Sequence, residues 1–127
     1  MVLAAVMSLW GVFEYSRFES VYQQQFRDPY KVSAQFSRLA GVRDAVPENA
    51  IIGYVTDLPR GTITDNATFD GAQYVLAPRM LQRTTSSDWV LGDFAKPDDF
   101  ASIGRKYGLR MERDFGEGVV LFRKEGR

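Results

Sequence analysis

The stretch that decides the fold is Ile51-Ile52-Gly53-Tyr54-Val55-Thr56-Asp57. It is a short apolar run rich in β-branched residues, which is the pattern of a buried strand. The turn-like Val46-Pro47-Glu48-Asn49 precedes it, and Asp57-Leu58-Pro59-Arg60-Gly61 forms a turn after it. The sequence therefore predicts a central strand at this position, and we expect the segments after it to be partners in one sheet.

A second central strand is predicted at Trp89-Val90-Leu91-Gly92-Asp93-Phe94, because this run is also apolar and also closes on an aspartate near a proline-containing turn. Lys96-Pro97-Asp98-Asp99 is expected to open a helix, with proline and acidic residues in its first turn and Gly108 as the residue just past its end. Residues 109–115 largely alternate in polarity, and residues 119–123 are expected to return antiparallel to them.

The remaining segments are assigned from the positions of proline and glycine, which interrupt helices and strands, and from the spacing of apolar residues. Asp28-Pro29 is expected to start a helix that ends near Gly41. Residues 62–65 are predicted to be a polar loop, residues 68–77 a helix that Pro78 ends, and residues 79–82 a short strand. This order predicts an α/β fold: one small domain over residues 28–127, with a mixed sheet and a C-terminal β-hairpin.

The domain is preceded by a helical segment over residues 1–27. Its first 13 residues carry no charged side chain, are apolar around the whole helical circumference, and include only one clearly polar side chain, Ser8. A membrane span takes about 20 apolar residues, whereas about 10–14 suit a signal-peptide core, an interfacial segment or a buried helix. We favour a membrane anchor that is incomplete at its start. A buried or dimerising helix and a cleaved signal peptide remain the alternatives.

Beyond Glu14 the helical pattern becomes one-sided, because aromatic residues recur at spacings of three and four between polar ones. Aromatic side chains favour the surface of a membrane, so those of this segment fit an aromatic belt. Ordinary packing against the domain explains them equally well. The residues concerned are Trp10, Phe13, Tyr15 and Tyr22 for the belt, and Tyr15, Phe18, Val21, Tyr22 and Phe26 for the one-sided face.

Composition excludes several classes of function. The chain has 16 Lys and Arg against 16 Asp and Glu, so no net positive field favours nucleic acid as a partner. It has no cysteine and no histidine, which excludes disulfides, thiolate or imidazole metal sites, and catalytic triads that use either residue. Any acid–base chemistry must use carboxylates, Lys, Tyr or Ser. We predict no metal and no cofactor, and enzymatic activity is the less favoured interpretation.

The best candidates for a ligand site are Asp57, Arg79 and Asp93. Ligands of open α/β sheets bind at the carboxyl ends of parallel strands, where Asp57 and Asp93 are predicted to lie. Aspartate at such an end more often caps the following turn through its side chain, and this is the favoured interpretation. No glycine-rich phosphate loop follows either strand, so a dinucleotide site is not expected.

A resemblance is carried by the segments 50–57, 73–79, 88–91, 107–109 and 115–122. Together they resemble a type of small bacterial domain of unknown function, and they are similar to the soluble segments that follow the membrane spans of some polytopic glycosyltransferase-like proteins. This resemblance implies a membrane-associated, extracytoplasmic accessory domain and transfers no active-site residue. Arg17, Arg27 and Lys31 follow the apolar segment, and by the positive-inside rule they favour the alternative of a cytoplasmic domain.

The function that we expect is therefore a non-catalytic, membrane-anchored accessory or interaction domain of the bacterial envelope, held by its N-terminal helix and available to a protein partner. The first alternative is a small-molecule binding domain for a carbohydrate or a lipid-linked sugar, with its pocket at Asp57, Arg79 and Asp93. The second alternative is an enzyme that uses those carboxylates.

Overall fold

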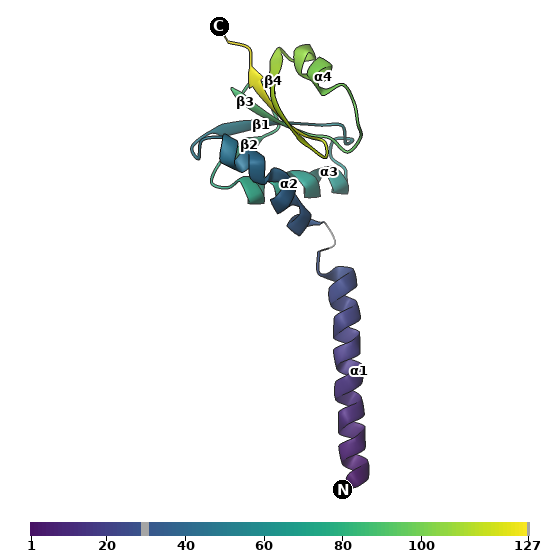
Figure 1. Ribbon diagram of the computed structural model, residues 1–127. Coiled ribbons are helices and arrows are strands. Elements are labelled where there is room, and N and C mark those ends of the chain that lie inside the picture. The colour runs from purple at the N-terminus through teal and green to yellow at the C-terminus, as the bar shows by residue number, and fades with distance from the viewer. Residues whose placement is uncertain (29–30, 127) are drawn as a thin grey trace. The chain divides into compact units, whose positions relative to one another are not determined.

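The computed structural model describes residues 1–28 and 31–126 (Figure 1). Its contacts divide the chain into two units, Met1–Val32 and Ser33–Arg127. The first unit contains helix α1 (Val2–Phe26). The elements that follow are α2 (Val32–Ala45), β1 (Ile51–Thr56), α3 (Ile63–Leu76), β2 (Met80–Gln82), β3 (Trp89–Asp93), α4 (Phe100–Lys106), β4 (Leu109–Gly116) and β5 (Val119–Lys124).

The five strands form one mixed sheet in the order β2-β1-β3-β5-β4. Strand β1 lies parallel to both β2 and β3, whereas β5 lies antiparallel to β3 and to β4. The predicted α/β class, the mixed sheet and the C-terminal hairpin are confirmed. Both runs that the sequence marks as central strands, β1 and β3, have a neighbour on each side.

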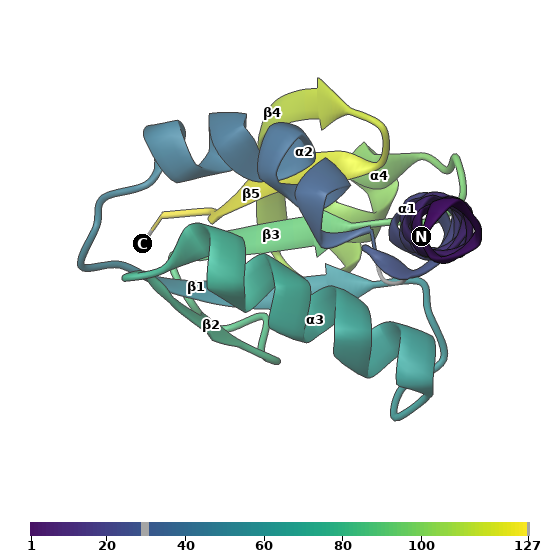
Figure 2. The ribbon, with the colours of Figure 1, turned by 90° about the horizontal axis from the view of Figure 1, so that it is seen from below.

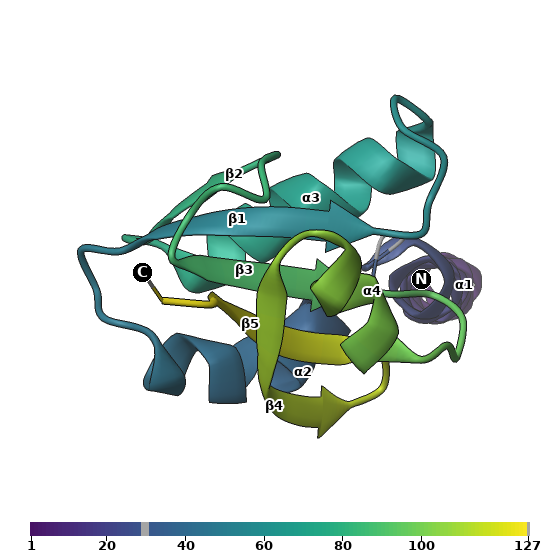
Figure 3. The ribbon, with the colours of Figure 1, turned by 90° about the horizontal axis from the view of Figure 1, so that it is seen from above.

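Helices cover both faces of the sheet. Helices α2 and α3 lie over one face, as Figure 2 shows, and the short α4 lies over the other (Figure 3). Each face has its own apolar cluster. The larger cluster, under α2 and α3, is built from Leu39, Val42, Val46, Ile52, Tyr54, Ala72, Val75, Leu76, Leu81, Leu91, Val119 and Leu121. The smaller one is built from Val90, Phe94, Leu109, Val120 and Phe122.

The prediction of a polar loop over residues 62–65 is wrong, because these residues begin α3. Thr62 is the N-cap residue, and its side chain accepts a hydrogen bond from the backbone N–H of Asp65. This bond satisfies one of the N–H groups that the first helical turn leaves free.

The helix predicted to open at Lys96-Pro97 begins later than expected. Its N-cap residue is Asp99, whose side chain accepts a hydrogen bond from the backbone N–H of Ser102. The preceding backbone is held in a loop by Asp57, as described below. At the other end, Gly108 follows the helix with a φ of +69°, as predicted for a residue just past a helix end. Pro29, the expected first helical residue of α2, lies outside the described residues.

Helix α1 is a single helix of 25 residues, all of them described, and none of its residues is buried. Its aromatic side chains contact one another along the helix, with ring centroids 6.1 Å apart for Phe18 and Tyr22 and 5.0 Å apart for Tyr22 and Phe26. Among the helices of the described residues, none has a stretch that is both long enough and apolar enough to cross a membrane.

Candidate functional site

The topology of the sheet places a candidate site at the carboxyl ends of β1 and β3. These two strands are parallel neighbours, and Thr56 of β1 pairs with Asp93 of β3 at their ends. The chain leaves β1 toward α3 on one face and leaves β3 toward α4 on the other (Figures 2 and 3). Ligands of open α/β sheets commonly bind where the connections diverge in this way.

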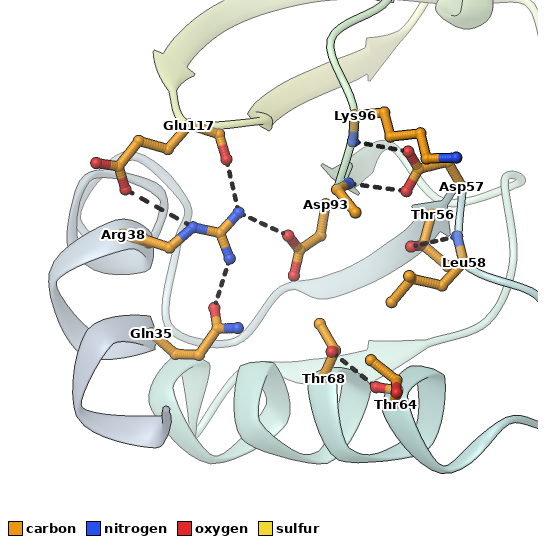
Figure 4. A network of polar contacts seen from close by, with 11 residues as sticks. Gln35, Arg38, Thr56, Asp57, Leu58, Thr64, Thr68, Asp93, Lys96 and Glu117 are labelled. Atoms are coloured by element: carbon orange, nitrogen blue, oxygen red, sulfur yellow. Dashed lines mark hydrogen bonds and ion pairs between the residues drawn. The ribbon is translucent and has the colours of Figure 1, made fainter. Parts of the chain in front are cut away.

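Asp57, the first residue predicted for the site, links the loop after β1 to the loop after β3 through hydrogen bonds. Its Oδ1 accepts a hydrogen bond from the backbone N–H of Ala95 at 2.8 Å, and its Oδ2 accepts one from that of Lys96 at 2.9 Å (Figure 4). Both carboxylate oxygens are therefore engaged with the backbone. This is the capping role that the sequence favoured for an aspartate at a strand end, and it joins the end of β1 to the segment after β3.

Arg79, the second predicted residue, lies at the opposite end of the sheet. It immediately precedes β2, whose first residue, Met80, pairs with the first residue of β1, Ile51. The Arg79 side chain is buried, and its Nε donates a hydrogen bond of 2.7 Å to the carbonyl oxygen of Val46, just past the end of α2. A cation at this position suits the negative end of a helix. The structure does not bring Arg79 together with Asp57 and Asp93.

Asp93, the third predicted residue, lies at the carboxyl end of β3, and only 3% of its surface is exposed. Its Oδ1 lies 3.0 Å from Nη2 of Arg38 on α2. Arg38 is itself oriented by Gln35, to whose Oε1 it donates, and by the carbonyl oxygen of Glu117 in the β4–β5 turn (Figure 4). Burial raises the pKa of Asp93, and the positive charge of Arg38 partly opposes that rise. Asp93 Oδ2 has no hydrogen-bond partner among the described residues.

Tyr54 lies beside Asp93 on the same face of the sheet and was not predicted as a site residue. Its side chain is 5% exposed, and its ring meets that of Phe69 on α3 edge-on, with the centroids 5.1 Å apart. Burial, followed by the nearby negative charge of Asp93, raises the pKa of the Tyr54 hydroxyl. Tyr54 Oη also lacks a hydrogen-bond partner within the described part of the chain. Both of these polar atoms are enclosed by the protein.

A second charged pair, between Asp65 and Arg83, lies beside β1. Asp65 Oδ1, at the start of α3, lies 2.9 Å from Nη1 of Arg83, and its Oδ2 accepts a hydrogen bond from the backbone N–H of Gly61. The hydrogen bond from Arg83 is the main cause that lowers the pKa of Asp65. The guanidinium of Arg83 also lies over the ring of Phe69, 4.4 Å from its centroid. Asp65 is therefore a fully paired structural carboxylate.

The surface is hollowed on both sides of these strand ends. One hollow, of about 270 Å³, is lined by Tyr54, Val55, Thr56, Leu58, Arg60, Asp65, Arg83, Thr85 and Tyr107. Another, of about 410 Å³, is lined by Phe94, Ala95, Lys96, Pro97, Phe100, Asp114, Gly116, Glu117 and Gly118. Within the described residues, no group of three or more acidic, histidine or cysteine side chains is arranged to hold a metal ion.

No protein-family model, no curated protein and no solved structure matches the chain. The resemblance to segments of glycosyltransferase-like proteins therefore stays a prediction.

Proposed function

We propose that the protein is a non-catalytic accessory domain that associates with a membrane through α1. The observation that supports this proposal most strongly is the exposure of α1, in which none of the 25 residues is buried. Large apolar side chains stand on all sides of its first half, and every one of them is more than half exposed: Met1, Val2, Leu3, Val6, Met7, Leu9, Trp10, Val12 and Phe13. So large an apolar surface calls for an apolar partner.

Lipid suits this segment better than a protein groove does. A helix that docks into a groove needs only one apolar face, whereas a segment that is apolar around its circumference has to be surrounded. The one clearly polar side chain, Ser8, donates its hydroxyl hydrogen to the carbonyl oxygen of Ala4 at 2.8 Å. Such a bond within the helix satisfies the hydroxyl where no water is present.

The second half of α1 has the character of a membrane surface segment. It begins with the first charged residue, Glu14, and carries Arg17 and Glu19 between its aromatic residues. The 13 uncharged residues before it extend over about 20 Å as a helix. This is less than the roughly 30 Å of a hydrocarbon core. In our proposal the first half of α1 enters the bilayer and the aromatic residues lie at its surface.

The α/β unit would then be the part that reaches a partner beside the membrane. Our proposal is a domain of the bacterial envelope on the extracytoplasmic side, in keeping with the resemblance carried by the strands. Arg17 and Arg27 support the cytoplasmic alternative. Protease treatment of intact and permeabilised cells that contain the tagged protein distinguishes the two sides, because an extracytoplasmic domain is cut once the outer barrier alone is opened.

The proposal is tested by flotation of the purified full-length chain with phosphatidylcholine vesicles. We expect the wild type to float with the vesicles and to remain bound in high salt. Leu9→Glu should abolish flotation, because it places a charge in the uncharged half of α1. Gln24→Glu is the matched control, since it adds the same carboxylate to an exposed position in the polar half and should leave flotation intact.

The competing role for α1 is a helix that dimerises. A dimerising α1 predicts that the wild type forms a stable dimer without lipid and that Leu9→Glu dissociates it. It also predicts that the wild type does not float with vesicles. Sedimentation equilibrium of the same proteins separates the two roles. A wild-type chain that stays with the soluble fraction as a dimer would refute membrane association.

A further inference from the structure

The end of β1 has a strand on one side only, because its neighbour β2 is shorter. Strand β1 has six residues and β2 has three, so that β2 pairs with β1 only as far as Gly53 (Figure 3). One further backbone hydrogen bond runs from the Tyr54 N–H to the carbonyl oxygen of Thr84. Beyond it, the hollow of about 270 Å³ lies beside β1 in place of a strand.

This hollow lies in the plane of the sheet, because residues from both faces line it. Tyr54 lines it from the face covered by α3, where its ring meets that of Phe69. Val55 packs against the smaller apolar cluster on the opposite face, and it lines the hollow together with Tyr107, at the end of α4. A ligand in the hollow therefore occupies the place that the next strand of the sheet would take.

Two backbone groups of β1 point toward this place. The N–H and C=O of one residue point to the same side of a strand, and those of the next residue point to the other side. Since the Tyr54 N–H points away from β3 and toward Thr84, the Tyr54 C=O and the Thr56 N–H also point away from β3. Among the described residues, no hydrogen bond from a loop or a side chain reaches either group. The end of β1 thus offers one acceptor and one donor, as an open strand does.

The two outer strands of the sheet are protected against pairing with another chain, whereas the end of β1 is not. Proteins protect sheet edges by short strands, charged side chains and bulges. Strand β2 is short, and the register of β4 with β5 is shifted at two places. Strand β4 also carries four charged side chains, those of Arg110, Glu112, Arg113 and Asp114. The segment Tyr54-Val55-Thr56 has no charged side chain, and its register with β3 is continuous.

We propose that the hollow beside β1 binds an extended peptide segment of a partner protein, which adds to the sheet as a strand next to residues 54–56. Main-chain hydrogen bonds hold a peptide in this mode of recognition, and side-chain contacts select it. In this complex the Thr56 N–H donates to a carbonyl oxygen of the peptide, and the Tyr54 C=O accepts from one of its N–H groups.

Charge in the lining favours a peptide with an acidic side chain. The positive charge of Arg83 is offset by Asp65, 2.9 Å away. Arg60, at an exposed position of the same lining, forms no ion pair among the described residues. The lining therefore keeps one positive charge, which a carboxylate of the peptide neutralises.

This proposal gives the α/β unit a kind of partner that the membrane association of α1 leaves open, and it does not rest on that association. Leu9→Glu separates the two claims, because it should abolish flotation and leave peptide binding at the level of the wild type. Loss of flotation alone concerns α1, and loss of peptide binding alone concerns the hollow.

Hydrogen exchange of the full-length chain in a neutral detergent, followed by NMR, is the first test. We expect the Thr56 N–H to have a protection factor about tenfold or more below that of the Val55 N–H, which faces β3. Equal protection of the two groups would mean that the Thr56 N–H already has a partner, and it would overturn the proposal.

The second test is a titration with the peptide acetyl-Thr-Val-Glu-Val-Thr-amide, whose β-branched residues favour an extended backbone. We expect saturable shifts of the Thr56 amide signal and slower exchange of its hydrogen. The same peptide with all its amide nitrogens methylated cannot donate from its backbone and should not bind. Equal binding of the two peptides, or shifts that do not saturate, would contradict strand addition.

Arg60→Glu tests the charge of the lining and should weaken peptide binding about tenfold or more. Arg113→Glu is the matched control, because it makes the same change at an exposed position on β4, at the opposite edge of the sheet, and should leave binding unchanged. Two outcomes would replace the peptide by another occupant and so refute the proposal. Sodium acetate that causes the same shifts would indicate a site for a carboxylate alone. Protection of the Thr56 N–H that rises with protein concentration, in the absence of peptide, would indicate a second copy of the chain.

Discussion

Nη2 of Arg38 lies 3.0 Å from Oδ1 of Asp93 and also donates a 2.7 Å hydrogen bond to the carbonyl oxygen of Glu117. One guanidinium therefore joins α2, the end of β3 and the turn between β4 and β5. The two partners differ in exposure, with 20% of the Arg38 side chain and 3% of the Asp93 side chain accessible to solvent. The negative charge is thus buried, while the positive charge remains partly hydrated.

Arg38→Met should lower the free energy of unfolding by about 3 kcal/mol at neutral pH. The substitution leaves the buried carboxylate of Asp93 without its cation, and the loss of one partner of a buried pair costs roughly 3–5 kcal/mol. We take the low end because Arg38 is partly exposed. Urea unfolding followed by circular dichroism measures the change.

Two further variants test whether the loss of stability comes from the unpaired carboxylate of Asp93 or from the removal of an arginine as such. Arg43→Met removes an exposed pair with Asp44, and such pairs contribute about 0.5 kcal/mol. The double variant Arg38→Met/Asp93→Leu replaces the buried pair by apolar side chains and should recover most of the lost stability. If the double variant were as unstable as Arg38→Met, the unpaired charge would not be the cause.

Stability should depend on pH through two carboxyl groups that act in opposite directions. Burial raises the pKa of Asp93, so the folded protein binds a proton at a higher pH than the unfolded chain, in which aspartate titrates near 3.9. Its protonation therefore increases stability as the pH falls through that raised value. Arg83 lowers the pKa of Asp65, whose stabilising effect is complete above about pH 4 and is lost as the pH falls through the lowered value.

Urea midpoints measured from pH 7 downward check both signs. In Asp93→Asn the increase in stability on approaching about pH 4 should disappear, while the loss at lower pH remains. In Asp65→Asn the loss below about pH 4 should become smaller. An Asp93→Asn protein that kept the full increase would show that another group causes it.

Much of the fold could be predicted because the strands carry their own signal. The apolar runs that become β1 and β3 are bounded by turn residues, and both are central in the sheet. The sequence also contains a signal for the start of α3. In Thr62-Ile63-Thr64-Asp65 an acidic residue follows a threonine by three positions, which is the spacing found at helix starts. The late start of α4 was not predictable locally, since Asp57, 38 residues before Ala95, holds the loop in front of it.

The candidate site was predictable only in part. The position of Asp93 is predictable because it ends a strand. The order of the strands suggests that Arg79 lies near Asp93, but the register between β1 and β2 puts Arg79 at the opposite end of the sheet. The partner of Asp93 comes from α2, 55 residues away. Tyr54 stands in an apolar stretch, where an aromatic ring predicts core packing and nothing in the sequence marks its hydroxyl as part of a polar site.

Thr62→Ala should lower the free energy of unfolding by about 1 kcal/mol, which is typical for the loss of an N-cap side chain. The Thr62 hydroxyl accepts from Asp65 N–H and donates to the carbonyl oxygen of Pro59, so both bonds are lost. Thr62→Ser is the matched control and should stay close to the wild type, because serine keeps the hydroxyl. Equal losses in both variants would mean that the methyl group, not the cap, stabilises the start of α3.

Gly118→Ala should destabilise the protein far more than Gly116→Ala, although both glycines lie in the same turn with positive φ angles of +77° and +83°. An L-residue in this region costs about 1–2 kcal/mol, and that is the expected effect of Gly116→Ala, where an added Cβ meets no other atom of the described chain within 4 Å. At Gly118 the Cβ would also overlap the carbonyl oxygen of Phe94. The same segment holds the 2.8 Å hydrogen bond from Phe94 N–H to Gly118 O, which joins the end of β3 to the hairpin. We therefore expect Gly118→Ala to cost well over 2 kcal/mol in urea unfolding, and equal costs for the two variants would exclude this contact as the reason for glycine.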